Sequence, residues 1–161
     1  MTDDEIAGLP YRPCVGIMLL NRDGQIFAGQ RIDNHRDAWQ MPQGGIDEGE
    51  SPRDAALREL GEETGITDHG FVSVLRESAE WHAYDLPRQV IPRFWNGRYR
   101  GQTQRWFALR YTGPDSGINI DTEEPEFGTW AWMGHAELIQ KIVPFKRDTY
   151  AMVFQEFADL I

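Results

Sequence analysis

Residues 44–66 read GGIDEGESPRDAALRELGEETGI, and this stretch predicts one helix with a well-marked start and end. Ser51 is a favourable N-cap, Pro52 suits the first helical position, and Asp54 completes a pattern similar to a capping box. Gly65 is typical of the residue that ends a helix. Between these ends we expect a helix of about three and a half turns.

The predicted helix has an apolar side and, next to it, an acidic side. The apolar side contains Ala56, Leu57 and Leu60. The acidic side contains three glutamates at positions i, i+3 and i+4, namely Glu59, Glu62 and Glu63. Like charges at this spacing repel by a few tenths of a kcal/mol per pair. The helix therefore concentrates negative charge beside a surface that faces the core.

Two interpretations of the acidic side are open, a solvated surface and a metal site. A solvated surface usually offsets its glutamates with lysines one turn away; here only Arg58 stands beside Glu62. Gly61 also costs about 1 kcal/mol of helix propensity relative to alanine, so the helix is not optimised for stability. Three hard oxygen ligands on one turn suit Mg²⁺ or Mn²⁺, especially when phosphates and water complete the coordination shell. The metal site is the favoured interpretation.

The whole chain has the size and composition of one folded domain. It has 161 residues, 40% of them apolar and 26% charged, which is ordinary for a globular protein. No apolar run is long enough to cross a bilayer, and the acidic residues 1–10 lack the features of a signal peptide. The single cysteine, Cys14, has no disulfide partner. We expect a cytoplasmic protein without a membrane partner, with a core over residues 11–157 and a flexible tail over residues 1–10.

Apolar patterns predict strands on both sides of this helix. Two runs that flank NRDG, CVGIMLL and QIFAGQR, are typical of a β-hairpin with an Asp-Gly turn. FVSVLRE, residues 81–84, RWFALRY and FGTWAWM are further predicted strands. The final segment, FKRDTYAMVFQEFADLI, has apolar residues at helical spacing, which predicts an amphipathic helix. Since no linker or repeat divides the chain, we expect one mixed α/β domain.

Charge is unevenly distributed along this acidic chain. The formal net charge of −10 argues against nonspecific nucleic-acid binding by the whole surface, and we expect no DNA partner. Residues 88–105, RQVIPRFWNGRYRGQTQR, nevertheless contain five arginines and no acid. Interleaved with Phe94, Trp95 and Tyr99, these arginines suit a surface that holds a single strand by phosphate contacts and base stacking. An exposed loop with a structural tryptophan is the alternative.

The glutamate-rich stretch resembles the Nudix box, G-x5-E-x7-R-E-U-x-E-E-x-G-U, in which U is aliphatic. Every specified position matches, at Gly44, Glu50, Arg58, Glu59, Leu60, Glu62, Glu63, Gly65 and Ile66. So many restricted positions at fixed spacing make the match far more specific than a short motif. The resemblance implies the Nudix α/β/α sandwich, with a mixed sheet and a loop–helix–loop over residues 44–66. It also implies hydrolysis of a diphosphate bond that is linked to another moiety.

The same resemblance implies roles for individual residues. The implied site for Mg²⁺, or for Mn²⁺ in its place, comprises Gly44, Glu59, Glu62, Glu63 and Glu126. Arg58 is implied to orient the glutamates and to share in catalysis, and Glu50 to support the loop–helix junction together with Gly44 and Gly65. Glu126, in EPEF, is implied to reach the metal site from a loop, and a surface acid is its plain alternative. The chemistry is consistent, because metal ions both neutralise a phosphoric anhydride and activate water.

Motifs outside the box narrow the resemblance. YRPCVGIML, WQMPQGG, GQTQRWFAL, EPEFGTWAW and FKRDTY occur in order and extend the likeness over about residues 11–157. Together they resemble the bacterial RNA pyrophosphohydrolases and the related bacterial and plant dinucleoside polyphosphate hydrolases. This likeness implies removal of pyrophosphate from the 5′-triphosphate end of RNA, or asymmetrical cleavage of dinucleoside polyphosphates as the alternative. A non-catalytic nucleotide-binding domain is the remote alternative, because such a domain would be free to lose the ligands kept here.

Substrate contacts are also implied by the likeness. Phosphate-binding groups are implied at Arg12, Arg31 and Tyr84. A wall for a base is implied at Val143 and Phe145, just before Lys146. Plain alternatives stay open, namely surface ion pairs for the arginines and core packing for the aromatic residues. Around residues 88–100 the sequence departs from the RNA enzymes of this family, which leaves acceptance of long RNA open.

Overall fold

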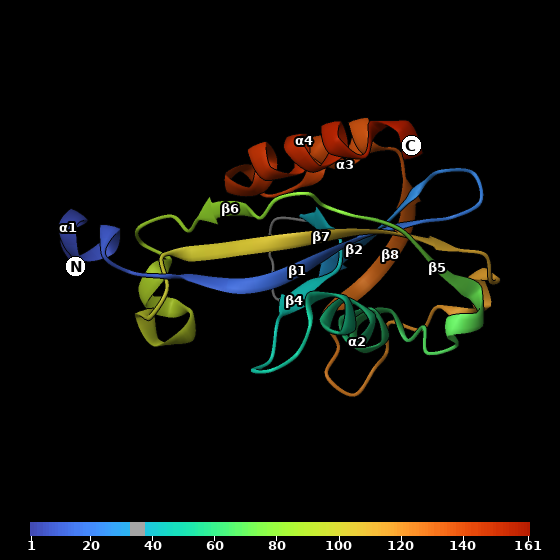
Figure 1. Cartoon of the computed structure of the whole chain (residues 1–161), viewed down its shortest axis with the longest axis horizontal. Helices are drawn as coiled ribbons and strands as arrows, with labels where there is room; N and C mark the ends of the chain where they lie inside the picture. The colour runs from blue at the N-terminus through green and yellow to red at the C-terminus, as the bar shows by residue number, and fades with distance from the viewer. Residues whose placement is uncertain (33–37) are drawn as a thin grey trace.

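The computed structural model describes residues 1–32 and 38–161 of the chain (Figure 1). The strands are β1 (Tyr11–Leu20), β2 (Ile26–Arg31), β3 (Trp39–Gln40), β4 (Gln43–Gly45), β5 (Val72–Glu77), β6 (His82–Asp85), β7 (Gly101–Tyr111) and β8 (Phe127–Met133). The α-helices are α1 (Asp3–Ala7), α2 (Pro52–Thr64), α3 (His135–Lys141) and α4 (Arg147–Glu156). All the strands predicted from the sequence, and the C-terminal helix, are present.

The centre of the sheet is a parallel pair, β1 and β7. Their register runs from Tyr11 opposite Gly101 to Leu20 opposite Arg110. The main order of strands is β3-β2-β1-β7-β5, with β4 also paired to β1, β6 to β7 and β8 to β2. The remaining pairs are antiparallel, and they include the predicted β1–β2 hairpin. The sheet is therefore mixed, as predicted.

Helices cover both faces of the sheet, with α3 and α4 on one side and α2 on the other (Figure 1). Successive residues of β1 point to opposite faces. Met18 and Leu20 belong to the cluster under α4, whereas Ile17 and Leu19 belong to the cluster under α2. This explains why β1 is an unbroken apolar run instead of an alternating one. The predicted α/β/α sandwich is confirmed.

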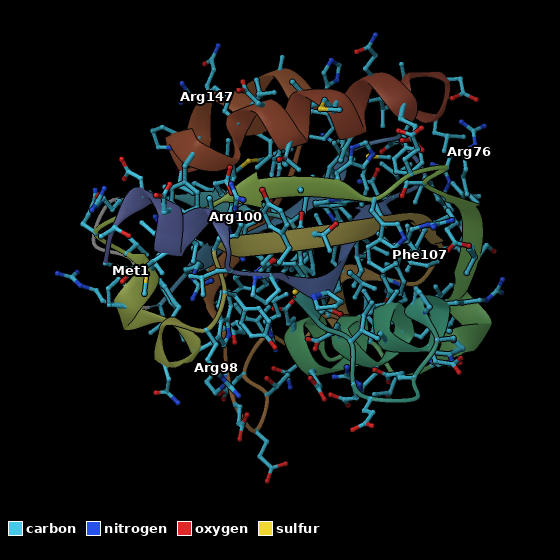
Figure 2. The ribbon with its side chains drawn as sticks, turned by 60° about the vertical axis from the view of Figure 1, so that its left-hand side comes forward. Met1, Arg76, Arg98, Arg100, Phe107 and Arg147 are labelled. Carbon is cyan, nitrogen blue, oxygen red and sulfur yellow. The ribbon has the colours of Figure 1, made fainter. Side chains whose placement is uncertain are left out.

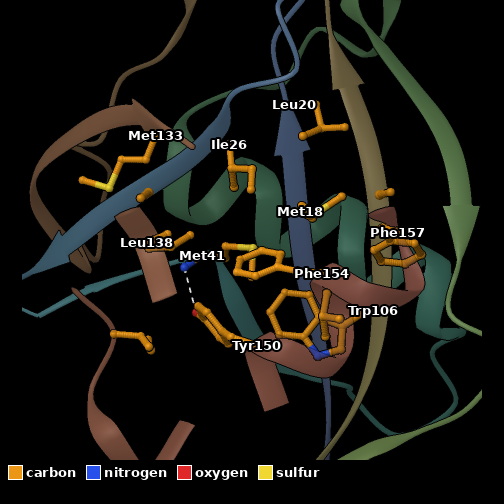
Figure 3. Packing of buried hydrophobic residues seen from close by; sticks show 14 residues of the cluster. Met18, Leu20, Ile26, Met41, Trp106, Met133, Leu138, Tyr150, Phe154 and Phe157 are labelled. Atoms are coloured by element: carbon orange, nitrogen blue, oxygen red, sulfur yellow. Dashed lines mark hydrogen bonds between the residues drawn. The ribbon is translucent and has the colours of Figure 1, made fainter. Parts of the chain in front are cut away.

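A buried hydrogen bond anchors the layer formed by α3 and α4. The Met41 N–H donates to the hydroxyl of Tyr150, on α4, at 2.9 Å (Figure 3). The Tyr150 ring also packs edge-on against Trp106 of β7. Because Met41 follows β3 and lies two residues before β4, this bond fixes the segment that leads into the glutamate-rich stretch.

Residues 1–10 differ from the predicted flexible tail. Thr2 and Glu5 form a reciprocal capping box that starts α1. Ile6 and Leu9 pack against a small buried cluster of Tyr84, Leu86 and Ile91. Arg88 donates to the Asp3 carboxylate and to the Met1 carbonyl. A Thr-x-x-Glu capping signal and two apolar residues three positions apart account for this conformation.

Candidate active site

Helix α2 begins and ends where the sequence predicts. Ser51 Oγ accepts the Asp54 N–H at 3.1 Å, and Gly65 closes the helix with φ of 74°, in the left-handed region. The apolar side packs on the sheet through Ala55, Ala56, Leu57 and Leu60. These contacts fix the rotation of the helix about its axis and therefore the direction in which its glutamates point.

The glutamates of α2 differ in their exposure, and two of them have a raised pKa. The Glu62 side chain is 57% exposed and that of Glu59 is 12% exposed, whereas Glu63 is buried. Burial raises the pKa of Glu59 to about 7, and the charges of Glu62 and Glu126 add to this rise. Burial likewise holds the pKa of Glu63 well above its usual value, reinforced by Glu59 and Glu126. Burial, with a smaller contribution from neighbouring carboxylates, therefore disfavours the ionised form of Glu59 and Glu63.

Arg58 links the helix to the loop that precedes it. Its Nε and Nη2 each donate to Glu50 at 2.9 Å, and Nη2 also donates to the Gly45 carbonyl at 2.8 Å. Its Nη1 donates to Glu59 at 2.9 Å. The Arg58 guanidinium lowers the pKa of Glu50 to about 2. Arg58 and Glu50 therefore occupy positions suited to the predicted orienting and supporting roles.

Gly44 leaves the space that the Glu59 carboxylate occupies. A Cβ at position 44 would lie 2.0 Å from Glu59 Cδ, far inside van der Waals contact. Gly45, the next residue of β4, similarly makes room for Arg12. A Cβ at position 45 would lie 2.2 Å from Arg12 Nη2. The glycine pair of the box is thus needed for close approach of two charged side chains to the backbone.

Two predicted phosphate-binding arginines lie beside the glutamates. Arg12 Nη1 lies 3.6 Å from Cys14 Sγ, and its guanidinium lies 5.0 Å from the centre of the Trp95 ring. Arg31 Nη2 lies 3.9 Å from Glu126 Oε2. Glu126 comes from the loop before β8. It lies close enough to Glu59 and Glu63 for its charge to raise the pKa of both.

The remaining predicted contacts form a partly aromatic wall. Tyr84 is buried, and burial raises the pKa of its hydroxyl above the usual range. Its ring lies 5.8 Å from that of Phe145, centre to centre, and 5.5 Å from Lys146 Nζ. Lys146 Nζ also donates to Gln40 Oε1 at 3.4 Å. The Tyr84 ring is thus packed in the core and also lines a cavity, and its role in phosphate binding stays a prediction.

One open cavity of about 670 Å³ joins these groups. The predicted residues that line it are Arg12, Arg31, Gly44, Glu59, Glu62, Glu63, Tyr84, Glu126, Val143, Phe145 and Lys146. Glu50, Arg58 and Gly65 are not in this lining and lie behind or beside it. Residues that are distant in sequence therefore line one cavity, with acids and cations on its wall, and their individual roles stay predictions.

The carboxylates are held by protein donors and do not form a ready-made metal cage. Within residues 1–32 and 38–161, no three histidine, cysteine, aspartate or glutamate side chains are grouped so that they could hold a metal ion. Glu59 accepts from Arg58, and Glu63 Oε2 accepts the Gln43 N–H at 2.8 Å. The donor chemistry still fits a hard divalent cation, which takes carboxylate and phosphate oxygens and keeps several waters. A cation bound beside Glu59 and Glu63 would offset the burial that raises the pKa of both carboxyls.

Several polar residues of the cavity were missed from the sequence. Gln40, Gln43 and Gln102 line it, and the buried Gln104 donates to Gln43 at 2.7 Å and to Gln102 at 2.8 Å. Gln40 is the last residue of β3, Gln43 is the first residue of β4, and Gln102 and Gln104 lie in β7. The motifs WQMPQGG and GQTQRWF carry these residues, so the signal was present, but nothing local shows that the two motifs meet.

The arginines of residues 88–105 have different surroundings. Arg98 Nε donates to the Trp95 carbonyl at 3.2 Å, and Arg100 Nε donates to Asp85 at 2.9 Å (Figure 2). Arg105 pairs with Glu77 at 3.2 Å. Of the five arginines, Arg93 lines the cavity. The stretch is therefore not one uniform basic surface.

Comparison with known proteins agrees with this geometry. The family model described as the NUDIX domain matches residues 10–153. A protein named RNA pyrophosphohydrolase from Roseobacter denitrificans is 57% identical over 157 residues, covering 98% of each chain. A second protein of that name, from Dinoroseobacter shibae, is 54% identical and covers 99% of each chain.

Solved structures show the same fold at low sequence identity. The E. coli dihydroneopterin triphosphate pyrophosphohydrolase superposes with a TM-score of 0.68 and 19% identity, over 89% of this chain and 96% of its own. A C. elegans Ap4A hydrolase superposes with a TM-score of 0.62 and 15% identity, over 91% of this chain and 98% of its own. Within the part of the chain that the structure describes, no helix is both long and apolar enough to span a membrane.

Proposed function

Because the chain belongs to the Nudix family, we propose that it is an RNA pyrophosphohydrolase, which converts a 5′-triphosphate end of RNA to a 5′-monophosphate. Relatives that cover nearly the full chain at more than half identity carry that name. Water supplies the oxygen that bonds to phosphorus, the anhydride bond between the α and β phosphates breaks, and pyrophosphate leaves.

The observation that carries the proposal is the pairing of opposite charges across one cavity. Glu59, Glu62 and Glu63 lie on one part of its wall, and Arg12, Arg31 and Lys146 lie on other parts. A triphosphate carries several negative charges, so it needs cations beside it and a bound metal between it and the glutamates. A cavity lined by glutamates alone would repel this substrate.

Divalent metal ions serve the Nudix hydrolases in general, and Mg²⁺ is the proposed ion here. Glu59, Glu62, Glu63 and Glu126, with Gly44 alongside, would hold it. When bound, it neutralises phosphate charge and lowers the pKa of water. Arg58 and Glu50 keep Glu59 in place through the hydrogen bonds between them.

The cations and the aromatic wall position the substrate in this proposal. Arg12 and Arg31 bind phosphate oxygens, and Lys146 is held nearby through Gln40 and Tyr84. Val143 and Phe145 offer an apolar wall for a base. A guanidinium suits this role because its fork of N–H groups matches the geometry of phosphate oxygens.

A comparison of two substrates tests the function. We expect kcat/KM with Mg²⁺ to be higher for a 5′-triphosphorylated RNA than for diadenosine tetraphosphate, and pyrophosphate to be released from the RNA. The reverse preference would overturn the proposal in favour of dinucleoside polyphosphate hydrolysis. Binding of both substrates without turnover of either would instead support a non-catalytic nucleotide-binding domain.

A further inference from the structure

The loop between β6 and β7 brings an exposed aromatic residue to the mouth of the cavity. Phe94 lies between two short 3₁₀ turns, Ile91–Arg93 and Trp95–Gly97. Arg93, Phe94 and Trp95 all line the cavity that contains the glutamates. Phe94 is 41% exposed, which is high for a large apolar side chain next to a polar site. The loop therefore presents an apolar ring to whatever occupies the cavity.

The backbone of this loop is held in an unfavourable conformation. Trp95 has φ of 48° and Asn96 has φ of 58°, so two successive residues other than glycine lie in the left-handed region. This region is unfavourable for residues other than glycine, and such residues concentrate at functional sites. The anchor is Ile91, which is buried beside Tyr84 and Leu86. A strained conformation of this kind persists because surrounding contacts fix it.

In this conformation the Trp95 ring contacts other side chains, whereas the Phe94 ring stays partly exposed. The Trp95 ring lies 5.0 Å from the Arg12 guanidinium and packs edge-on against Tyr99 at 5.9 Å. Trp95 therefore positions Arg12, one of the proposed phosphate-binding groups. Phe94 contacts the Trp95 ring at 5.6 Å, and much of its own surface faces solvent. Its contact with Trp95 limits its freedom to turn away.

We propose that Phe94 is a stacking surface for a nucleobase near the 5′ end of the RNA, with Arg93 beside it for a backbone phosphate. The inference rests on the proposed function, since an RNA carries further bases and backbone phosphates beyond the nucleotide that bears the triphosphate. Stacking on an aromatic ring tolerates any base, because each base has a π-face. Phe94 would thus favour substrates with several nucleotides over a free nucleotide, and it would do so without reading sequence.

A substitution series with a matched control tests this role. Phe94→Ala should raise KM for a triphosphorylated RNA about tenfold with kcat changed less than twofold, and Phe94→Trp should restore KM. Trp81→Ala is the control: Trp81 is also 41% exposed and stacks with an arginine, Arg105, but it does not line the cavity. Its KM should stay within twofold of the wild-type value.

RNAs that lack one base identify the contact directly. For wild-type protein, an abasic site at one of the first three nucleotides should raise KM about as much as Phe94→Ala does. On that abasic RNA, Phe94→Ala should have no further effect. Additive losses, or an equal loss for the free nucleoside triphosphate, would overturn the inference. If Phe94→Ala fails to fold, Phe94→Leu, which keeps an apolar side chain without a ring, takes its place in the same comparison. Wild-type protein that leaves all triphosphorylated RNA intact would refute the proposed function itself, whereas turnover without any dependence on Phe94 would refute this inference alone.

Discussion

Helix α2 and the loop over residues 88–100 both carry clustered charge, but their charges are placed by different means. On α2, a repeat of three and four residues puts Glu59, Glu62 and Glu63 on one turn, and local capping fixes the ends. In the loop there is no such repeat. Partners far away in sequence decide where its arginines point, as Asp3 does for Arg88 and Asp85 does for Arg100. Periodic charge can thus be placed from sequence, whereas charge in an irregular loop cannot.

The largest effect should come from the periodic region. Glu62→Gln should lower kcat by about three orders of magnitude or more, because metal activation of water is the main catalytic contribution. Glu62 is largely exposed, so the thermal unfolding midpoint should change little. Glu48→Gln, in the exposed part of the same loop–helix segment, is the control and should keep full activity. A Glu62→Gln enzyme with near-normal turnover would refute the metal interpretation of α2.

A smaller loss should follow when the backbone next to Glu59 is altered. Gly44→Ala places a methyl group where the Glu59 carboxylate lies, so this side chain must move. A shift of about 1 Å at a catalytic group costs roughly 10²-fold in rate, and we expect kcat to fall by that order. Gly8→Ala, whose Cβ would have only ordinary contacts 3.6 Å away, is the control. Equal activity of the two variants would show that Gly44 is not needed for the placement of Glu59.

The pKa of Glu59 predicts a dependence of stability on pH in metal-free protein. Burial raises this pKa from 4.5 to about 7, so the folded protein binds more protons than the unfolded chain between these values. The contribution of Glu59 to the free energy of unfolding is therefore fully present below about pH 4.5 and should be lost as the pH rises to about 7. Thermal unfolding in EDTA would measure this slope.

Added Mn²⁺ and a Glu59→Gln variant are two controls for this dependence of the unfolding midpoint on pH. Mn²⁺ should raise the unfolding midpoint, and more so at higher pH, because it binds the ionised carboxylates. Glu59→Gln should flatten the slope in EDTA. If the slope is unchanged in this variant, other groups cause the pH dependence and the charge on α2 is less concentrated than its geometry indicates.

The smallest effects should come from the arginines that the loop uses for its own structure. Arg98→Ala and Arg100→Ala should leave kcat/KM for RNA within twofold, because Arg98 is bonded to the Trp95 carbonyl and Arg100 to Asp85. Arg93→Ala, at the cavity, should flatten the log–log salt dependence of RNA binding by about 0.7. An equal change of slope for Arg98→Ala would show that the loop acts as one basic surface after all.

How much of the site could be predicted follows from the same difference between periodic and irregular segments. The spacing within the Nudix box predicted that Glu59, Glu62 and Glu63 share one side of α2, because positions one turn apart lie on the same side of a helix. Val143 and Phe145 were placed by resemblance alone, and nothing local shows that they face Arg12 across a cavity. The amides Gln40 and Gln102 were missed for the same reason, since β3 and β7 are brought together by the strands between them.

The parallel pairing of β1 with β7 has a consequence for the order of events during synthesis. Each residue of β1 pairs with one about 90 positions later, as Tyr11 does with Gly101. At typical elongation rates that separation takes about 5 to 20 s to translate, and during this interval the apolar β1 lacks its central neighbour. Contacts of such long range also slow folding itself. Helix α2 is made early, but the cluster beneath it needs Phe107 and Leu109 of β7. Glu59 and Glu63 therefore acquire their buried environment only after most of the chain has left the ribosome.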